Sequence, residues 1–416
     1  MRQIFKSLFS LCLVLVFLLI SCGDPENQNS DDTASLSYRI DSLFRSAVEN
    51  QEIPAAVAYI TVNEKEIYHK AFGWKIMESE VPLATSDIFR LASMTKALTA
   101  ISIMQLVEKG SLDLDDEVYR YIPEFENPNI LIEVLPDSSF RSRPAESEIT
   151  IRQLLTHTSG IGYGFQDDMY NALIIKNNIS EGFEDDERTS YENIQRIAGI
   201  PLLFEPGEDY VYSLSMDVLG VVIEQVSGLR YDRYIQQNIL DPLNMDDSYF
   251  ILPEEERYRL VSVYQPAETG VGLERTTYPD TAYPVARHKQ FFSGGADLCS
   301  TADDYSNILK MLLNGGIYEG TRILSESSVE TMLAKQSAYA EGDSYQGFAA
   351  WITNEVGAKK GPRGLGSFGF GGFYDTQSWA DPELNLTAVL LFQMYPNNEY
   401  SIHQKFEDLV YQTIGK

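Results

Sequence analysis

The chain has 416 residues, of which 44% are hydrophobic and 12% are aromatic. This composition supports a large folded core and excludes an intrinsically disordered protein. Lysine and arginine total 32 against 61 aspartate and glutamate residues, which gives a formal net charge of −29. Such a charge repels phosphate backbones, so we expect no nucleic-acid partner.

The first residues have the pattern of an export signal. Arg2 and Lys6 precede an apolar stretch over residues 8–20, which is too short to remain as a membrane-spanning helix. Residues 19–22, Leu-Ile-Ser-Cys, resemble the lipobox of bacterial lipoproteins. This resemblance implies a signal peptide over residues 1–21, a lipidated Cys22, and a location at a bacterial membrane, on the periplasmic side or at the cell surface. The alternative is an ordinary signal peptide cleaved near a cysteine.

A polar segment rich in Asp, Asn and Ser predicts a flexible tether over residues 22–37. Cys12 leaves with the signal peptide, so Cys22 and Cys299 are the cysteines of the mature chain. If Cys22 carries a lipid, Cys299 has no partner, and the fold must hold without an internal disulfide.

Hydrophobic periodicity predicts elements along most of the remaining chain. Near the N-terminus we expect a helix over 38–50 and a hairpin of 55–61 with 67–72. An almost continuous apolar run from Ser93 to Lys109 predicts a buried helix that ends at Gly110. Later elements are short helices over 151–156 and 217–226, a helix over 301–313, strand-like runs over 347–352, 367–379 and 384–394, and a closing helix over 400–414.

Strands therefore occupy both ends of the sequence and helices occupy the middle. This order predicts an α+β fold, in which an antiparallel sheet built from N- and C-terminal strands is flanked by helices and carries an inserted, mostly helical lobe. We expect one domain over 38–416, with the sheet lobe at about 38–90 and 295–416 and the helical lobe at about 91–294.

Ser93 and Lys96 are the first candidates for chemistry. Residues three apart on a helix project from the same face, so the amine can reach the hydroxyl. Burial and the positive helix N-terminus both favour a neutral amine that can accept the serine proton. The alternative is a helix-capping serine beside a snorkelling lysine, because Ser-x-x-Lys often occurs by chance.

Two other segments are candidates for the same site. Tyr212 lies in the loop between the Pro206-Gly207 turn and an apolar helix. Residues 370–372, Phe-Gly-Gly, place glycines inside a strand pattern, which indicates either a close approach to the backbone or a bend.

Together these segments resemble the superfamily of serine β-lactamases, DD-peptidases and family VIII carboxylesterases, from about Tyr38 to the C-terminus. Ser-Met-Thr-Lys at 93–96 matches the nucleophile motif of that superfamily, Tyr-Ser-Leu at 212–214 stands at its Tyr-x-Asn, and Phe-Gly-Gly at 370–372 stands at its Lys-Thr-Gly or Trp-Gly-Gly. Segments 112–116, 149–160 and 294–304 resemble its structural signatures.

The resemblance implies acyl transfer without a cofactor. Ser93 would attack a carbonyl, Lys96 and Tyr212 would share the proton, and backbone N–H groups of Ser93 and Phe373 would bind the oxyanion. A phenol with an ordinary pKa of about 10 needs neighbouring positive charge to act as a base, so Tyr212 should lie close to Lys96. Either of the two could be the general base.

Departures from the family pattern favour an esterase for small, fairly apolar esters. Phe370 replaces the cation that holds a substrate carboxylate, and Leu214 replaces an amide. Each lost contact weakens binding of the older substrate class by about 1–3 kcal/mol. The predicted substrate-binding residues are Phe370, Gly371, Gly372 and Leu214.

Two alternatives remain open. If Arg287 or Arg363 reaches the site and restores a cation, the same fold would give a β-lactamase, DD-peptidase or D-amino-acid peptidase. A binding or sensor lipoprotein without turnover is the other. The sequence lacks a Gly-x-Ser-x-Gly elbow, and its four histidines show no metal-ligand spacing, so we expect neither an α/β-hydrolase site nor a metal.

Overall fold

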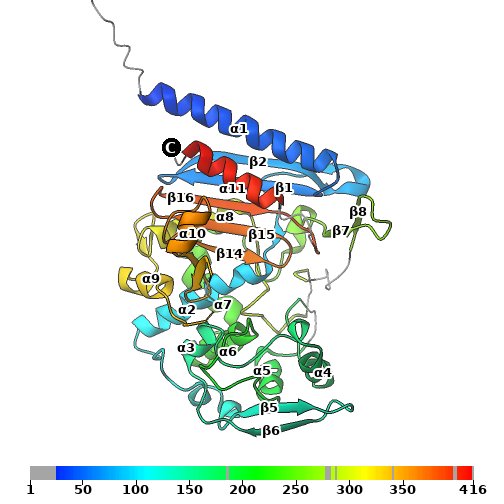
Figure 1. Cartoon of the computed structure of the whole chain (residues 1–416), viewed down its shortest axis with the longest axis vertical. Helices are drawn as coiled ribbons and strands as arrows, with labels where there is room; N and C mark the ends of the chain where they lie inside the picture. The colour runs from blue at the N-terminus through cyan, green and yellow to red at the C-terminus, as the bar shows by residue number, and fades with distance from the viewer. Residues whose placement is uncertain are drawn as a thin grey trace, which may run out of the picture.

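An eight-stranded antiparallel sheet forms the upper half of the computed structural model in the view of Figure 1, with the helical lobe below it. The strand order is β12-β13-β14-β15-β16-β1-β2-β3. The N-terminal hairpin of β1 (Ala55–Val62) and β2 (Lys65–Ile76) pairs with the C-terminal strand β16 (Leu386–Leu391), from Val57↔Leu391 to Val62↔Leu386. The predicted α+β fold, with one sheet built from both ends of the chain, is confirmed. The structure describes residues 25–183, 187–276, 283–285, 288–339, 342–396 and 401–414.

The remaining strands of the sheet are β3 (Val81–Pro82), β12 (Ser344–Gln346), β13 (Trp351–Thr353), β14 (Phe368–Gly372) and β15 (Thr376–Asp381). Shorter elements outside it are η1 (Met77–Ser79), η3 (Val118–Arg120), η4 (Pro123–Phe125), η5 (Gly164–Gln166), η6 (Gln236–Leu240), η7 (Asp241–Leu243), η8 (Glu254–Arg259), β7 (Tyr264–Pro266), β8 (Leu273–Arg275), β10 (Ile317–Tyr318), β11 (Thr321–Arg322), α9 (Glu326–Leu333) and α10 (Glu355–Lys360).

Helices cover both faces of the sheet. In Figure 1, α1 (Pro25–Glu49) and α11 (Ser401–Ile414) lie on one face, and α8 (Ala302–Leu313) lies on the other. Strands β1 and β16 are accordingly buried along almost their whole length, which explains why their sequences are continuous apolar runs without alternation.

The helical lobe is inserted between two short strands that pair with each other. These are β4 (Phe89–Arg90) and β9 (Cys299–Ser300). Between them lie the 3-10 turn η2 (Ala92–Thr95), helices α2 (Lys96–Glu108), α3 (Ile151–Leu155), α4 (Asp168–Lys176), α5 (Ser190–Ala198), α6 (Ser215–Ser227) and α7 (Tyr231–Ile235), and the small hairpin of β5 (Asn129–Val134) and β6 (Phe140–Pro144). Helix α2 is buried from Lys96 to Leu106, as its apolar run predicts.

Three expectations need correction. Helix α1 begins at Pro25, so a helix replaces the predicted tether over 25–37; proline is compatible with the first helical turn, and no further proline interrupts the segment. The run 347–352 contains a turn, because Gly347 approaches the carbonyl of Met332 so closely that a Cβ would lie 2.4 Å from it. The run 367–379 likewise contains the turn that joins β14 to β15.

The predicted signal peptide and Cys22 lie outside the described residues. Within the described ranges, no helix combines the length and apolar character needed to cross a bilayer. Cys299 is a buried free thiol.

The packing of α1 depends on Phe44, which is fully buried. Its ring lies 5.5 Å from the rings of Phe72 and Phe406 and 6.3 Å from that of Phe392, between centroids. We expect Phe44→Ala to lower the free energy of unfolding by about 3–5 kcal/mol, measured by denaturant titration. Tyr38→Ala on the same helix is the control, because Tyr38 is 76% exposed. Equal stability of the two variants would contradict the assignment of α1 to the core.

Candidate active site

The predicted nucleophile lies in a tight turn rather than within the helix itself. Ser93 is partly exposed in η2, whereas Ala92, Met94 and Thr95 on either side of it are buried. Ala92 has a φ of 45°, a left-handed conformation that costs about 1–3 kcal/mol for a residue other than glycine. Hydrogen bonds hold the turn: Thr95 Oγ1 donates to the carbonyl of Ala92 at 2.6 Å, and Tyr305 OH donates to that of Met94 at 2.9 Å. The residues around Ser93 are therefore buried and fixed, while Ser93 itself is left partly exposed. We call residues 92–95 the nucleophile turn.

Lys96 begins α2 directly after this turn, and its side chain is buried. The Nζ atom lies 3.1 Å from Ser93 Oγ, 2.8 Å from the carbonyl oxygen of Gly295 and 3.4 Å from Tyr163 OH. The structure thus brings the predicted serine and lysine into hydrogen-bonding distance. Gly295 and Tyr163 come from distant parts of the chain and complete the surroundings of the amine.

Tyr212 lies beside the same amine. Lys96 Nζ lies over the Tyr212 ring, 4.6 Å from its centroid, so the ring and the amine are neighbours, and a role of the Tyr212 hydroxyl in proton transfer stays a prediction. His157 packs on the other side, with ring centroids 4.8 Å apart, and its Nδ1 lies 2.9 Å from Ser213 Oγ. Burial, followed by the charge of Lys96, lowers the pKa of His157 to about 3, so His157 stays neutral. It supports Tyr212 without adding charge.

Two buried residues of the site were not predicted from the sequence. Tyr163 and Asp217 surround Gly295 together with Lys96: a Cβ on Gly295 would lie 3.2 Å from each of Tyr163 OH, Asp217 Oδ2 and Lys96 Nζ. Burial raises the pKa of Tyr163 well above its usual value and that of Asp217 to about 6. An aromatic residue just after the 149–160 segment and an acidic residue opening an apolar helix were the available signals.

The end of strand β14 borders the nucleophile turn. Strand β13 pairs with only Phe368 and Gly369 of β14. The backbone of 370–372 therefore extends beyond β13, while it still pairs with β15 on its other side. Gly372 approaches the turn so closely that a Cβ would lie 2.2 Å from the carbonyl oxygen of Leu91. Phe373, whose N–H is predicted to bind the oxyanion, follows immediately in sequence.

The structure separates the four predicted substrate-binding residues into two groups. Gly371 is exposed and Gly372 is half-buried at the strand end. Phe370 is 4% exposed and Leu214 is fully buried, and both side chains belong to the main core. Direct contact of these two side chains with a substrate is therefore a prediction that their burial does not support. At these two positions, apolar side chains packed in the core stand where the family pattern has polar groups.

Arg363 does not supply the missing cation. Its guanidinium makes two hydrogen bonds to the Glu407 carboxylate, at 3.0 and 2.8 Å, and lies over the Trp379 ring, 5.0 Å from the centroid. Trp379 belongs to the cluster beneath α1 and α11, on the sheet face opposite α8. The other proposed cation, Arg287, lies outside the described residues.

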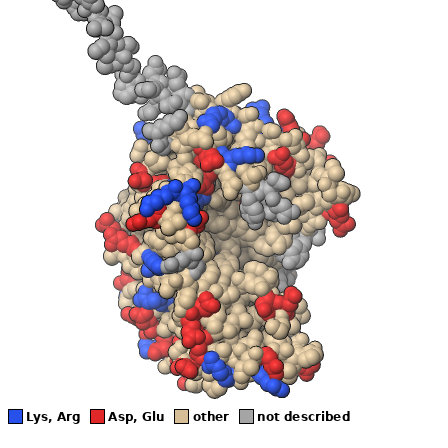
Figure 2. All heavy atoms as spheres, in the orientation of Figure 1, with Lys and Arg blue, Asp and Glu red and all other residues tan. Residues whose placement is uncertain are grey.

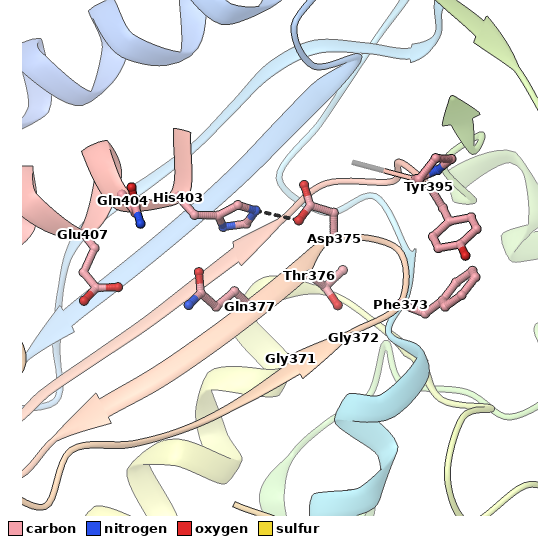
Figure 3. A pocket seen from close by; sticks show the side chains of 11 residues that line it. Gly371, Gly372, Phe373, Asp375, Thr376, Gln377, Tyr395, His403, Gln404 and Glu407 are labelled. Carbon is pink, nitrogen blue, oxygen red and sulfur yellow. Dashed lines mark hydrogen bonds and ion pairs between the residues drawn. The ribbon is translucent and has the colours of Figure 1, made fainter. Parts of the chain in front are cut away.

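A pocket of about 640 Å³ lies behind the same strand end (Figure 3). Its wall includes residues 371–373, Gln377 and His403, and His403 Nε2 lies 2.7 Å from Asp375 Oδ1. Side chains alternate along a strand, so Gln377 shares the α11 face with Trp379, two residues further on, whereas Gly372 faces Leu91. The pocket therefore adjoins the strand from the side opposite the nucleophile turn. On the face shown in Figure 2, charged side chains surround a central recess whose visible floor is mostly uncharged.

A partly exposed serine beside a buried lysine and a tyrosine ring, on this sheet-and-helix fold, is the arrangement that the resemblance predicts for a serine acyl-transfer site. The chain matches the family model described as Beta-lactamase over residues 40–411, and it belongs to that family. It is an enzyme of the serine hydrolase and acyl-transferring class, as the resemblance implied.

Relatives in this family include esterases and acyltransferases. The chain is 30% identical to esterase EstB of Burkholderia gladioli, covering 86% of this chain and 91% of that one. It is 26% identical to a monacolin J acid methylbutanoyltransferase of Aspergillus terreus, covering 89% and 95%. The structure resembles simvastatin synthase from Aspergillus terreus with a TM-score of 0.77 and 25% identity, covering 92% and 98% of the two chains.

The close approach of Gly372 generates a prediction with a matched control. Gly372→Ala would place Cβ 2.2 Å from Leu91 O and 2.4 Å from Thr376 Oγ1, so β14 must shift away from the nucleophile turn. We expect at least about a 100-fold loss of kcat/KM, because the oxyanion donors move out of position. A Cβ on Gly361, which lies outside the site, meets nothing closer than the Gly357 carbonyl oxygen at 3.6 Å, so Gly361→Ala should retain activity. Similar activities of the two variants would contradict the role of the strand end.

Proposed function

We propose that the chain is an esterase that hydrolyses small, fairly apolar esters through an acyl-enzyme on Ser93. The observation that carries the proposal is the 3.1 Å contact between Lys96 Nζ and Ser93 Oγ, close to the part of β14 that β13 leaves unpaired. A buried amine at this distance can take the serine proton as the hydroxyl attacks.

The proposed reaction has two steps. In acylation, Ser93 Oγ bonds to the ester carbonyl carbon, its proton passes to Lys96 or Tyr212, and the carbonyl oxygen becomes an oxyanion that the N–H groups of Ser93 and Phe373 stabilise. The carbon–oxygen bond to the alcohol then breaks, and the alcohol leaves with the proton. In deacylation, water attacks the acyl carbon and gives a proton to the same base; the bond between the acyl carbon and Ser93 Oγ then breaks, the base returns the proton to Ser93 Oγ, and the acid leaves.

Three features favour esters over β-lactams or peptides. Phe370 and Leu214 provide no cation or amide for a substrate carboxylate or amide, and Arg363 is paired with Glu407 on the other face of the sheet. The relative from Burkholderia gladioli is itself named an esterase. Acylation of an alcohol in place of water would use the same acyl-enzyme.

Turnover of p-nitrophenyl acetate and butyrate tests this proposal. We expect a burst or steady release of p-nitrophenol from the wild type and a loss of at least about 10³-fold in Ser93→Ala, because the nucleophile is removed. Ser102→Ala is the control: Ser102 is a buried serine of helix α2 that donates to Leu98 O, and its removal should leave turnover intact.

Other outcomes favour the alternatives. Labelling of Ser93 by a fluorescent penicillin without ester turnover would favour a penicillin-interactive enzyme. Absence of both turnover and modification by a serine-directed fluorophosphonate would favour a binding or sensor protein and overturn the esterase proposal.

We also infer from the sequence that Cys22 is lipidated and holds the enzyme at a bacterial membrane. On this basis, full-length protein expressed in a bacterium should partition into the detergent phase and carry a diacylglyceryl mass at its new N-terminus. Cys22→Ser should abolish the lipid mass and move the protein to the aqueous phase. A wild-type protein found wholly in the aqueous phase, with a free cysteine thiol, would disprove this inference.

A further inference from the structure

A buried carboxylate behind the Ser93–Lys96 pair has no part in the mechanism given above. Asp217 lies in the first turn of α6 and is 1% exposed. Ser293 Oγ donates a hydrogen bond to Asp217 Oδ1, and the nearby Gly295 N–H also stabilises the carboxylate, but Oδ2 is buried and has no partner in good hydrogen-bonding geometry. An unpartnered carboxylate oxygen in the protein interior is costly, so its retention needs a reason.

The free oxygen faces the catalytic amine. A Cβ on Gly295 would be 3.2 Å from both Asp217 Oδ2 and Lys96 Nζ, so the two atoms are separated by no more than twice that distance. A side chain at 295 would crowd both atoms, so glycine at this position keeps the space around them open. At such separations in a buried site, opposite charges attract strongly.

The other titratable groups around Asp217 cannot balance its charge. Asp297 accepts a hydrogen bond from the Ser293 N–H at 2.7 Å and pairs with Lys289 at 2.7 Å, and both side chains of that ion pair are fully buried. Tyr163 and Tyr231 face Asp217 from the loop after α3 and from α7, and burial raises the pKa of each phenol, so both remain neutral. Among the described groups around it, Lys96 is the cation left for Asp217.

We propose that Asp217 is a positioning residue, whose buried carboxylate stabilises the ammonium that forms when Lys96 takes the proton of Ser93. In that step the O–H bond of Ser93 breaks, an N–H bond forms on Lys96, and the negative charge passes to the carbonyl oxygen of the substrate. Asp217 then occupies the place of the third group in a nucleophile–base–carboxylate series. The inference rests on the proposed function.

The raised pKa also sets how the stability of the fold depends on pH. Burial raises the pKa of Asp217 to about 6, above its ordinary value of about 3.9. A group whose pKa is higher in the folded than in the unfolded state contributes stability below its unfolded pKa, and that contribution is lost as the pH rises through about 6. At neutral pH the ionised carboxylate therefore destabilises the fold.

Asp217→Asn tests the role, because asparagine keeps the shape and an acceptor for Ser293 but removes the charge. We expect kcat/KM for p-nitrophenyl butyrate to fall about 100-fold at pH 8, mainly through kcat. On the acid side of its pH profile, kcat/KM should fall to half of its maximum near pH 6 in the wild type and at a lower pH in the variant. The melting temperature should rise at pH 7.5 relative to wild type, and this difference should disappear near pH 4.

Asp304→Asn is the matched control. Asp304 is another buried aspartate, its pKa is raised to about 7 by burial, and it accepts hydrogen bonds from Ser248 and the Asp247 N–H, far along the chain from Lys96. The control should also raise the melting temperature at neutral pH, but it should leave kcat/KM and the pH profile unchanged.

Wild-type activity and an unchanged pH of half-maximal kcat/KM in Asp217→Asn would overturn the inference, as would loss of activity accompanied by a lower melting temperature. The second-order rate of Ser93 modification by a fluorophosphonate separates this inference from the proposed function, since it requires an activated serine but no ester. If the wild type cleaves no ester but Asp217→Asn slows this modification, the esterase proposal fails and the positioning role stands.

Discussion

The site depends on a lysine amine that is buried yet fully satisfied. Three hydrogen-bonding groups surround Lys96 Nζ, namely Ser93 Oγ, the Gly295 carbonyl and Tyr163 OH, so the amine has partners on several sides. A buried amine that lacks such partners is costly, so the surroundings of Lys96 have to be built before the amine can be placed there. Three parts of the helical lobe supply these groups. Helix α2 carries the Lys96 amine, the segment before β9 carries the Gly295 carbonyl, and the loop after α3 carries the Tyr163 hydroxyl.

Local sequence patterns predict the elements that carry this arrangement. The apolar runs of β1, α2 and β16 each reflect burial of the element itself, so they can be recognised without a partner. Helical spacing predicts the contact of Ser93 with Lys96, although Ser93 lies in the 3-10 turn that precedes α2. The fold class follows from the order of the elements, since strands at both ends of a chain are most simply joined in one sheet.

Other parts of the site depend on contacts between distant segments and leave little trace in local sequence. Tyr163 and Asp217 matter because the chain brings both to Gly295, and neither belongs to a motif used in the prediction. The burial of Phe370 and Leu214 was likewise not evident, because the family pattern places polar groups there and the structure packs apolar ones into the core. The turn at Gly347 arises from the nearby Met332 carbonyl, a feature that appears only once α9 is in place.

The short pairing of β4 with β9 lies where the chain enters and leaves the helical lobe. The nucleophile turn follows one of these strands within five residues, and Gly295 precedes the other within five residues. The hydroxyl, the amine and the carbonyl that receives its hydrogen bond are therefore all close in sequence to this pairing, whereas Tyr212 comes from the middle of the lobe. One hydrophobic core joins the sheet, through residues such as Val57 and Val389, to the lobe, through residues such as Leu98 and Leu219. The serine–lysine contact is therefore local in sequence, and the position of Tyr212 beside it depends on that shared core.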